Sequence, residues 1–569
     1  MPTSREIEQL LTGPGGAFEV VTGEVRGIPM KVYKQRMQSL REVAALGLAR
    51  GDEQTHVVYG DRRYGFAEFV SLANSVSATL KGVGVRRGDR VAVLSANNPE
   101  WCLTFWGTVD LGAIVVGLNG WWKTDEILYG LADSGARVLV ADGPRFERIA
   151  GELGECPDLE AIYLIDTDPA AASDDGRVRA FDELLRRPSP QLPDDPIDED
   201  DPAVIFYTSG TTGRPKGAIS THRSMIANLQ NTMYNAIAGA MANPEAAALP
   251  STGQASALLT SPLFHVSGCH SGIVVGMLAG IKTVIPVGRF EPEKAMKLIQ
   301  DEGVTVWATV PTMVWRVVED PRRHDYDLTS VGSIAYGGSP SAAELQRRVK
   351  ETFPNVKTLG NAYGLTESSS VATVNSGPDL VERPESVGRP LPVVEVKIVA
   401  DGAEVPTGGV GEIWIKGPII MPGYWNKPEA TADTVTDGWL HSGDIGYLDD
   451  DGFLYITDRA KDMIIRGGEN IYCVEIENRL VEHPAIAEAA VIGVPHPTLG
   501  EEVKAVVRLE PGATVSEAEV RSWVAAGLAD FKVPAHVELT DQFLPRNASG
   551  KLLKNVLRGE GEVSFAETM

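Results

Sequence analysis

The sequence predicts an α/β protein with two parallel-type sheets, a small β-barrel-like subdomain and a small α+β domain at its C-terminal end. Apolar runs typical of buried strands alternate with helical patterns twice, over about 90–142 and about 257–310. After Val393 the pattern changes to short strands separated by turns. Alternation of this kind indicates parallel sheets with helices on their faces.

Each of the two series has the same internal order. The first begins with RVAVLSA around Val91, and a helical pattern follows over 101–111. It continues through the strand-like AIVVGLN, the helical DEILYGLADSG and the strand-like RVLVAD. The second has ALLTSPL, KTVIPV and VTVWATV as strands, with helices near Gly272 and from Pro292. Each series therefore predicts one sheet.

Two segments lack a regular pattern. Residues 166–201 are rich in Asp, Pro and Ser, which predicts a surface connection. Residues 234–257 are rich in Ala with scattered Pro and Gly, which predicts a short helix and a mobile loop.

The C-terminal part of the chain has its own pattern. The strands VEVKIVADGAEV, GEIWIKG and GYLDDDGFLYITD make up the expected β-rich subdomain. From Ala460 the helices IENRLVEHP and SEAEVRSWVAAGLADF flank two further strands. Because 569 residues are too many for one core, at least two domains are expected. We place them at residues 1–459 and 460–569.

Composition excludes several classes of function. A net charge of −25 disfavours nucleic acid and anionic membranes as partners. The four cysteines form no CxxC pair and the histidines show no ligand spacing, so no structural metal is expected. The longest apolar stretch, 272–281, is too short to span a bilayer, and the N-terminus does not resemble a secretory signal. We therefore expect a cytoplasmic protein without an integral membrane segment; a homodimer is left open.

The strongest local motif is YTSGTTGRPKG at 207–217, which follows the apolar run AVIF. Its glycines allow an open backbone whose N–H groups can face a phosphate, and its hydroxyls and Lys216 add donors and a cation. The alternative is an ordinary glycine-rich turn, although such turns rarely combine these residues. The spacing does not fit a Walker A loop.

This motif resembles the phosphate loop of the adenylate-forming superfamily, which includes acyl-CoA synthetases, luciferases and peptide-synthetase adenylation domains. Further motifs of that family follow in the expected order: LFHVSG, YGGSP, NAYGLTES, GWLHSGDIGY, DRAKDMIIRGGENIYCVEIE and PRNASGKLLK. The resemblance covers nearly the whole chain and is closest to fatty acid–CoA ligases. It implies a ligase that uses ATP, Mg²⁺ and CoA to convert a carboxylic acid into an acyl-AMP and then an acyl-CoA.

The resemblance also implies roles for individual residues. Glu367 would organise Mg²⁺, and Thr366 would contact the α-phosphate. Asp444 and Arg459 would hold the ribose. The phosphates would lie against Thr208, Ser209, Gly210, Thr211, Thr212, Gly213 and Lys216. The adenine slot would be formed by Gly337, Gly338, Ser339 and Tyr363, and Asn361 and Gly364 would also belong to the ATP/AMP-binding residues.

The C-terminal motifs imply a moving domain. Lys551 in NASGKLLK would bridge the acid and the α-phosphate, stabilising charge as the adenylate forms. Lys461 occupies the family's hinge position. Rotation there would exchange the face carrying Lys551 for a CoA-binding face formed by Arg466, Gly467, Gly468 and Glu469.

The acid and the acceptor are less clearly specified. Peptide-synthetase domains carry an aspartate where this chain has His265, so an amino-acid substrate is disfavoured. His265 resembles a gate beside the acyl pocket; a packed core histidine is the alternative. The residues around it fit a fatty, branched, aryl or ring-bearing acid. Trp121 and Trp122 depart from the family pattern, as does Cys473. Three other activities stay open: an acyl-AMP ligase that loads a carrier protein, an oxidative luciferase, and an inactive nucleotide-binding relative.

Overall fold

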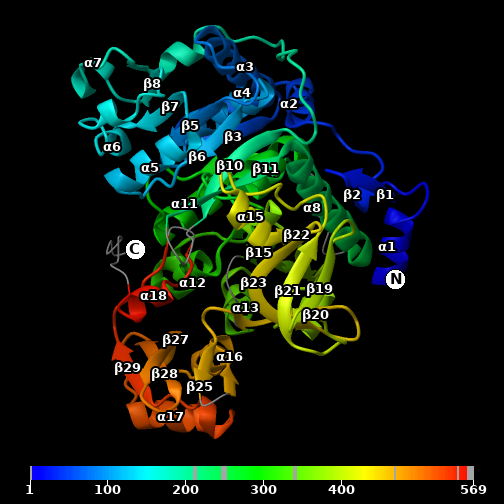
Figure 1. The fold of residues 1–569 in the computed structure, drawn as a ribbon, viewed down its shortest axis with the longest axis vertical. Coiled ribbons are helices and arrows are strands. Elements are labelled where there is room, and N and C mark those ends of the chain that lie inside the picture. Colours follow the sequence, from blue (N-terminus) through cyan, green and yellow to red (C-terminus); the bar gives the residue numbers. More distant parts are fainter. Residues whose placement is uncertain are drawn as a thin grey trace.

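The computed structural model of the protein describes residues 3–208, 214–244, 253–337, 343–466, 469–547 and 550–560. Two large sheets with helices, an antiparallel sheet and a small C-terminal sheet make up the fold (Figure 1). An N-terminal helix and hairpin, α1 (Ser4–Thr12), β1 (Val20–Val25) and β2 (Ile28–Tyr33), lie on one side of this body. The predicted α/β fold class is confirmed.

The first large sheet has seven strands, in the order β11 (Lys216–Thr221), β10 (Pro202–Thr208), β6 (Ile114–Gly117), β5 (Arg90–Leu94), β7 (Val138–Asp142), β8 (Ala161–Ile165) and β9 (Val178–Ala180). All neighbours are parallel except β10 and β11. Val91 and Val93 belong to a core that includes residues of α3 (Phe66–Gly82) and α4 (Pro99–Asp110). Ala92 and Leu94 belong to another that includes α5 (Thr124–Ser134) and α6 (Gly143–Phe146). Burial on both faces explains the unbroken apolar runs of these strands.

The second large sheet has nine strands. Their order is β18 (Arg389–Pro390), β17 (Thr373–Ser376), β16 (Thr358–Tyr363), β15 (Ser333–Gly337), β14 (Val306–Thr309), β12 (Ser256–Leu258), β13 (Lys282–Ile285), β3 (Thr55–Tyr59) and β4 (Arg62–Gly65). Its central strands are parallel, while β4, β17 and β18 are antiparallel additions. Helices in this part are α2 (Leu40–Ala49), α8 (His222–Ala242), α10 (Val275–Ala279), α11 (Pro292–Glu302), α12 (Pro311–Glu319), α13 (Ala343–Thr352) and α14 (Gly377–Glu382).

The predicted β-rich region is an antiparallel sheet. It contains β20 (Ala403–Glu404), β19 (Glu395–Ala400), β21 (Gly411–Lys416), β23 (Trp439–Leu448) and β22 (Val435–Thr436), with β24 (Leu454–Arg459) also paired to β23. The helix α15 (Pro428–Thr434) precedes β22.

The C-terminal part forms its own sheet and core at the opposite end of the molecule from the seven-stranded sheet (Figure 1). Its strands are β26 (Glu469–Ile471), β25 (Ile464–Arg466), β28 (Gly500–Leu509), β27 (Ile486–His496) and β29 (His536–Thr540). Its helices are α16 (Cys473–Val481), α17 (Glu517–Ala525) and α18 (Lys554–Leu557).

Two predictions about irregular segments need correction. Residues 166–201 are more than a connection, because they contain α7 (Pro169–Ala172), the edge strand β9 and a 3₁₀ turn at Phe181–Leu185. Phe181 is buried in the main core, so the polar composition of the segment concealed an anchored part. The predicted short helix near 234 is the end of the long helix α8, and residues 245–252 lie outside the described part.

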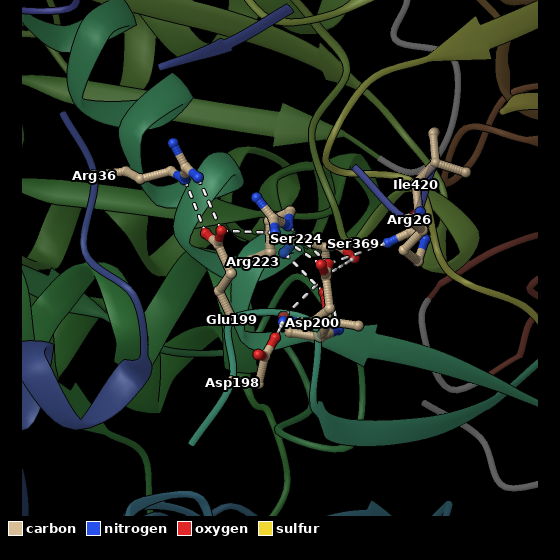
Figure 2. Close-up of polar contacts among 10 residues, drawn as sticks. Arg26, Arg36, Asp198, Glu199, Asp200, Arg223, Ser224, Ser369 and Ile420 are labelled. Atoms are coloured by element: carbon tan, nitrogen blue, oxygen red, sulfur yellow. Dashed lines mark hydrogen bonds and ion pairs between the residues drawn. The ribbon is translucent and has the colours of Figure 1, made fainter. Parts of the chain in front are cut away.

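An ionic cluster ties the N-terminal hairpin to the body (Figure 2). The Arg223 guanidinium on α8, only 7% exposed, contacts both Glu199 at 2.6 Å and Asp200 at 2.7 Å. Arg36 donates two hydrogen bonds of 2.8 Å to Glu199, and Arg26 lies 3.8 Å from Asp200. The cluster therefore joins segments almost 200 residues apart. No helix in the described part of the chain has the length and apolar composition needed to cross a bilayer.

Candidate active site

One cavity of about 1010 Å³ collects residues from both large sheets, the antiparallel sheet and the C-terminal part. Its wall includes twelve of the residues that the sequence singled out: Thr208, Lys216, His265, Gly337, Tyr363, Gly364, Thr366, Glu367, Asp444, Arg459, Lys461 and Lys551. These residues are up to 343 positions apart in the chain, from 208 to 551. The shared cavity, rather than any one motif, is what defines the candidate site.

A buried acid lies at one corner of the cavity. Asp444 on β23 is 4% exposed and faces Arg459, its partner across the β23–β24 ladder. The Arg459 Nε lies 3.3 Å from Asp444 Oδ1, and the Tyr363 hydroxyl donates to Asp444 Oδ2 at 2.8 Å. Burial raises the pKa of the Tyr363 phenol well above its usual range, and the neighbouring Asp444 carboxylate adds to this effect. The tyrosine therefore stays a hydrogen-bond donor that orients the acid.

Two glycines beside this corner are required by close backbone contacts. A Cβ atom on Gly364 would lie 1.5 Å from the Ser370 carbonyl oxygen, and one on Gly337 would lie 2.6 Å from the Ala362 carbonyl oxygen. Any side chain at either position would force the backbone apart. The glycines thus allow the backbone segments at the ends of β15 and β16 to pack closely where they line the cavity.

Lys216, Glu367 and Tyr424 form a polar group on another side of the cavity. The Lys216 Nζ lies 5.1 Å from the centre of the Tyr424 ring, a distance at which a cation and an aromatic face attract. The Tyr424 hydroxyl donates to Glu367 Oε1 at 2.8 Å. Thr208 pairs with Lys216 across the β10–β11 ladder, and its hydroxyl donates to the Lys216 carbonyl at 3.4 Å.

The residues here fit Mg²⁺ only as a partly hydrated ion. The described residues contain no group of three or more His, Cys, Asp or Glu side chains that could enclose a metal. Glu367 nevertheless lines the cavity, and within the described part of the chain only its Oε1 has a hydrogen-bond donor. Its Oε2 is left for a ligand. A single carboxylate together with phosphate oxygens and waters is the kind of ligand set that Mg²⁺ takes in nucleotide sites.

Lys551 enters the cavity from the C-terminal part. The preceding Gly550 has φ +80°, and its carbonyl accepts hydrogen bonds from Arg546 at 2.8 Å and Thr312 at 3.4 Å. Because Thr312 belongs to α12, this turn is tied to the N-terminal body. Burial and the cations Arg459 and Lys461 together lower the pKa of the Lys551 amine to about 7, against a smaller opposing effect of Asp444. Within the described residues the amine forms no ion pair, which suits it to receive an anion.

His265 lies on the cavity wall in a turn. Its Nδ1 lies 3.0 Å from the Ser267 hydroxyl, and its backbone carbonyl accepts from the Cys269 amide at 3.0 Å. Burial lowers the pKa of His265 to about 4, with a smaller contribution from Lys551. The imidazole is therefore neutral near pH 7. It is neither a plain core residue nor a charged ligand, because it faces the cavity as a neutral polar group.

Three predicted residues lie away from the cavity wall. Asn361 is buried on the opposite face of β16, where its amide donates to the Ser386 carbonyl at 3.4 Å, so its side chain is not a nucleotide contact here. Arg466 and Glu469 face each other across the β25–β26 hairpin, and Arg466 lies 3.5 Å from Glu502. The predicted residues Ser209, Gly210, Thr211, Thr212, Gly213, Gly338, Ser339, Gly467 and Gly468 lie outside the described part.

The departures from the family pattern have structural explanations. Trp122 is buried against the Tyr207 ring, with centroids 5.5 Å apart, and Trp121 meets Phe264 edge-on at 5.9 Å. Both tryptophans thus support segments of the cavity wall. The Cys473 thiol is buried, and its Sγ donates to the Asp462 carbonyl at 3.1 Å.

Sequence reasoning missed two groups of cavity residues. Tyr424, which contacts Glu367, lies in MPGYWN and had no recognisable signal because its partner is 57 positions away. The small residues on one face of β14, β15 and β16 did have a signal. In SIAYG and TLGNA every second residue is small, which is the spacing of one sheet face.

The comparisons with known proteins agree on one family. Residues 46–425 match the AMP-binding enzyme family, and residues 475–551 match the AMP-binding enzyme C-terminal domain. A feruloyl-CoA synthase from an Amycolatopsis species is 36% identical over 505 residues, covering 89% of this chain and 95% of that protein. A fatty acid–[acyl-carrier-protein] ligase, ScoC, from Streptomyces coeruleorubidus is 32% identical over 545 residues, covering 93% and 97%. The crystal structure of the anthranilate CoA ligase AuaEII in complex with anthranoyl-AMP has a TM-score of 0.83 and 28% identity, covering 92% of this chain and 97% of that one.

Proposed function

Because the chain belongs to the AMP-binding enzyme family, we propose that it is an ATP-dependent acid–thiol ligase that makes an acyl-CoA through an acyl-AMP. The observation that carries the proposal is the position of Lys551, a lysine whose pKa is lowered to about 7, in the same cavity as Asp444, Arg459, Lys216 and Glu367. This set supplies contacts for a ribose, for phosphates and for a carboxylate within one cavity.

The nucleoside is proposed to bind at the Asp444 corner. A carboxylate can accept hydrogen bonds from both ribose hydroxyls, and Tyr363 and Arg459 hold the carboxylate in place for that task. Gly337 and Gly364 line the same cavity, and we place the base against them. Tyr363 therefore has two proposed roles. The family resemblance implies that its ring stacks on the base, and its hydroxyl orients Asp444.

The phosphates are proposed to lie toward Thr208, Lys216 and Thr366. Glu367 would supply one ligand to a Mg²⁺ ion, and the Tyr424 hydroxyl would fix the orientation of that carboxylate. The metal, when bound, neutralises charge on the pyrophosphate leaving group. Lys216 adds a fixed cation on the same side of the cavity.

The reaction follows from these positions. The acid's carboxylate oxygen attacks the α-phosphorus of ATP, and pyrophosphate leaves. Lys551 stabilises negative charge shared by the carboxylate and the α-phosphate, a task that needs its protonated form. The thiol of CoA then attacks the acyl carbon and AMP leaves. Positioning and charge stabilisation suffice for both steps, and no protein nucleophile takes part.

The second step is proposed to need a different orientation of the C-terminal part. Arg466 and Glu469 are off the cavity wall while Lys551 lies on it. We place the hinge at Lys461, between domains of residues 1–459 and 460–569. A separate apolar core running from Ile464 to Val537 supports this division, because the small domain can move without opening the main core.

The acceptor has one competing assignment. The similarity to ScoC favours a carrier-protein thiol as the alternative to CoA. A luciferase or an inactive relative has no comparable support, and the cavity retains Lys216, Glu367, Asp444, Arg459 and Lys551.

The test is a pyrophosphate-release assay with ATP, Mg²⁺ and a panel of fatty, aryl and ring-bearing acids, followed by mass analysis of the product. We expect AMP and an acyl-CoA when CoA is the only thiol. Glu367→Gln should lower turnover more than tenfold at limiting Mg²⁺, by the usual size of a lost charged metal contact. Pyrophosphate release without any CoA product, restored by a carrier protein, would favour the alternative acceptor. No ATP-dependent product with any acid would refute the ligase.

A further inference from the structure

The nine-stranded sheet forms a floor of small residues under the cavity. Ala308, Ala335, Gly360 and Ser376 are direct neighbours across β14, β15, β16 and β17, and all four line the cavity. The alternate residues Trp307, Ile334 and Leu359 are buried on the other face of the sheet. The floor therefore follows from the strand period of two, with bulk on one face and small side chains on the other.

The floor extends away from the proposed reacting edge. Val310, Thr366 and Glu367 lie just beyond the carboxyl ends of β14 and β16, and Val310 is in contact range of the Gly550 position next to Lys551. From Gly337 at this edge, β15 runs back to Ser333, which pairs with Thr358. At ~3.3 Å per residue the floor is roughly 13 Å deep, and three strand spacings of ~4.8 Å make it roughly 14 Å wide.

A floor of these dimensions fits a flat, broad substrate better than a single alkyl chain. One extended chain would contact a strip along the floor and leave the neighbouring small residues without partners, which forfeits dispersion energy. Ring systems have the width to cover two or three strands at once. The small side chains on the floor leave this space open.

The floor and the side of α8 that lines the cavity are polar but uncharged. Ser333, Thr358 and Ser376 add hydroxyls to the floor, and Thr232 and Asn235 add polar groups from α8. None of the cavity residues contributed by β14–β17 or α8 is an acid or a base within the described part of the chain. A charged substituent on the substrate would therefore be buried there without a counter-ion, at a cost of several kcal/mol.

Asn235 is the residue best suited to recognise a substituent. Its amide lines the cavity and makes no hydrogen bond within the described residues. One helical face carries Asn228, Thr232 and Asn235, and Asn228 Oδ1 accepts from the Val371 amide at 3.1 Å. At 1.5 Å per residue, Asn235 lies roughly 10 Å along the axis from Asn228, similar to the depth of the floor. An amide both donates and accepts, so it can pair with a hydroxyl, a ketone or an ether oxygen.

We infer that the acid activated by this protein is an aryl or fused-ring carboxylic acid with an uncharged oxygen substituent far from its carboxylate, and that Asn235 recognises that oxygen. The inference rests on the proposed ligase function. It goes beyond that function by selecting one class among the fatty, aryl and ring-bearing acids.

The experiment compares kcat/KM for four acids: 2-naphthoate, 6-hydroxy-2-naphthoate, naphthalene-2,6-dicarboxylate and decanoate. With the natural sequence we expect the hydroxylated acid to exceed 2-naphthoate by roughly tenfold, since an unpaired buried amide costs about that much. The dicarboxylate should be at least ~100-fold worse than the hydroxylated acid because its second charge lacks a partner. Decanoate should be the poorer of the two apolar acids.

Two variants separate recognition from folding. Asn235→Leu keeps the volume and should reduce the advantage of the hydroxylated acid to about one- to twofold, with 2-naphthoate within about threefold of the natural protein. Ala335→Met should block both naphthoates while hexanoate turnover is retained, because it fills the middle of the floor. Because both residues line the acid site, the thermal unfolding temperature serves as the folding control for both variants.

The inference and the function fail in different ways. Decanoate preferred tenfold over both naphthoates, or an unchanged hydroxyl preference in Asn235→Leu, would overturn the inference and leave the ligase intact. If none of the five acids gave pyrophosphate release at saturating ATP, that result would count against the ligase function itself.

Discussion

Two groups of ion pairs connect distant parts of this molecule, and they are built differently. In the cluster of Figure 2, Arg223 and Arg36 both contact Glu199, and Arg223 also holds Asp200 with two hydrogen bonds of 2.7 Å. Between the N-terminal body and the C-terminal part, by contrast, Arg348 meets Glu510 at 2.9 Å and Arg508 meets Glu319 at 3.6 Å. The first group is shared and bidentate, whereas each pair of the second group is joined by one nitrogen and one oxygen.

We propose that the first junction is permanent and that the second can be released. Arg508 has a nearer partner, Glu488 at 3.1 Å, within the C-terminal part itself. Losing the contact to Glu319 would therefore leave Arg508 paired. Removing Arg223 would instead leave Asp200 with only the more distant Arg26, at 3.8 Å, and would leave Glu199 with Arg36 as its one remaining partner in the cluster. A lasting junction within the N-terminal body and a reversible one to the C-terminal part would allow the small domain to move Lys551 into the cavity and out again.

The largest expected effect is on stability, at the permanent junction. Arg223→Ala leaves Glu199 and Asp200 without their most buried partner and should lower the free energy of unfolding by about 3–5 kcal/mol. Chemical denaturation monitored by tryptophan fluorescence measures this. Lys297→Ala, which removes an exposed pair with Asp301, is the control and should change stability by less than about 0.5 kcal/mol. If both substitutions lowered the free energy of unfolding equally, the Arg223 cluster would be no stronger a junction than an exposed ion pair.

The next largest effect is expected on catalysis, at Lys551, which we propose is positioned by the Arg348–Glu510 and Arg508–Glu319 pairs. Lys551→Ala should slow formation of the acyl-adenylate by about 10²–10³-fold, the usual cost of removing one group that stabilises transition-state charge. Thioester formation from a supplied acyl-adenylate should stay within about threefold, because we propose that Lys551 serves only the first step. Quenched-flow measurement of each half-reaction gives both rates. Parallel loss of both would contradict the two-orientation proposal.

The pH dependence of acyl-adenylate formation is a second test of the proposed role of Lys551. The pKa of Lys551 is lowered to about 7, and only the protonated amine can stabilise the reacting anions. Below pH 7 the amine is charged, so kcat/KM for adenylation should be highest there and fall roughly fivefold between pH 7 and 8. Lys551→Arg should be slower but lose this decline, since a guanidinium keeps its charge. A decline at the same pH in the arginine variant would assign it to another group.

The smallest effect is expected at the releasable junction itself. Arg348→Glu places two acids together and should slow adenylation by about three- to tenfold, with stability changed by no more than about 1 kcal/mol. The double substitution Arg348→Glu with Glu510→Arg restores the opposite charges and should recover most of the rate. Single-turnover kinetics of the four proteins form a double-mutant cycle. No recovery in the double variant would mean that the Arg348–Glu510 pair does not position Lys551.

Sequence patterns determined more of the fold than of the site. The apolar runs around Val91 and over 304–310 became β5 and β14, since burial on both faces leaves a local signature. Strand order was not predictable in the same way. β3 pairs with β13 across more than 200 residues, and no local pattern encodes that choice.

The motifs predicted the chemistry through their residue types and through a family resemblance. The glycines, hydroxyls and lysine of 207–217 indicate a phosphate loop by themselves, whereas the ribose role of Asp444 and the role of Lys551 came from the resemblance. Tertiary structure alone decided which side chains meet. It joined Tyr424 to Glu367, turned Asn361 away from the cavity and brought the Asn235 amide to its wall. The physical reason is that these outcomes depend on sheet order and helix packing, which the whole chain sets through burial rather than any single segment.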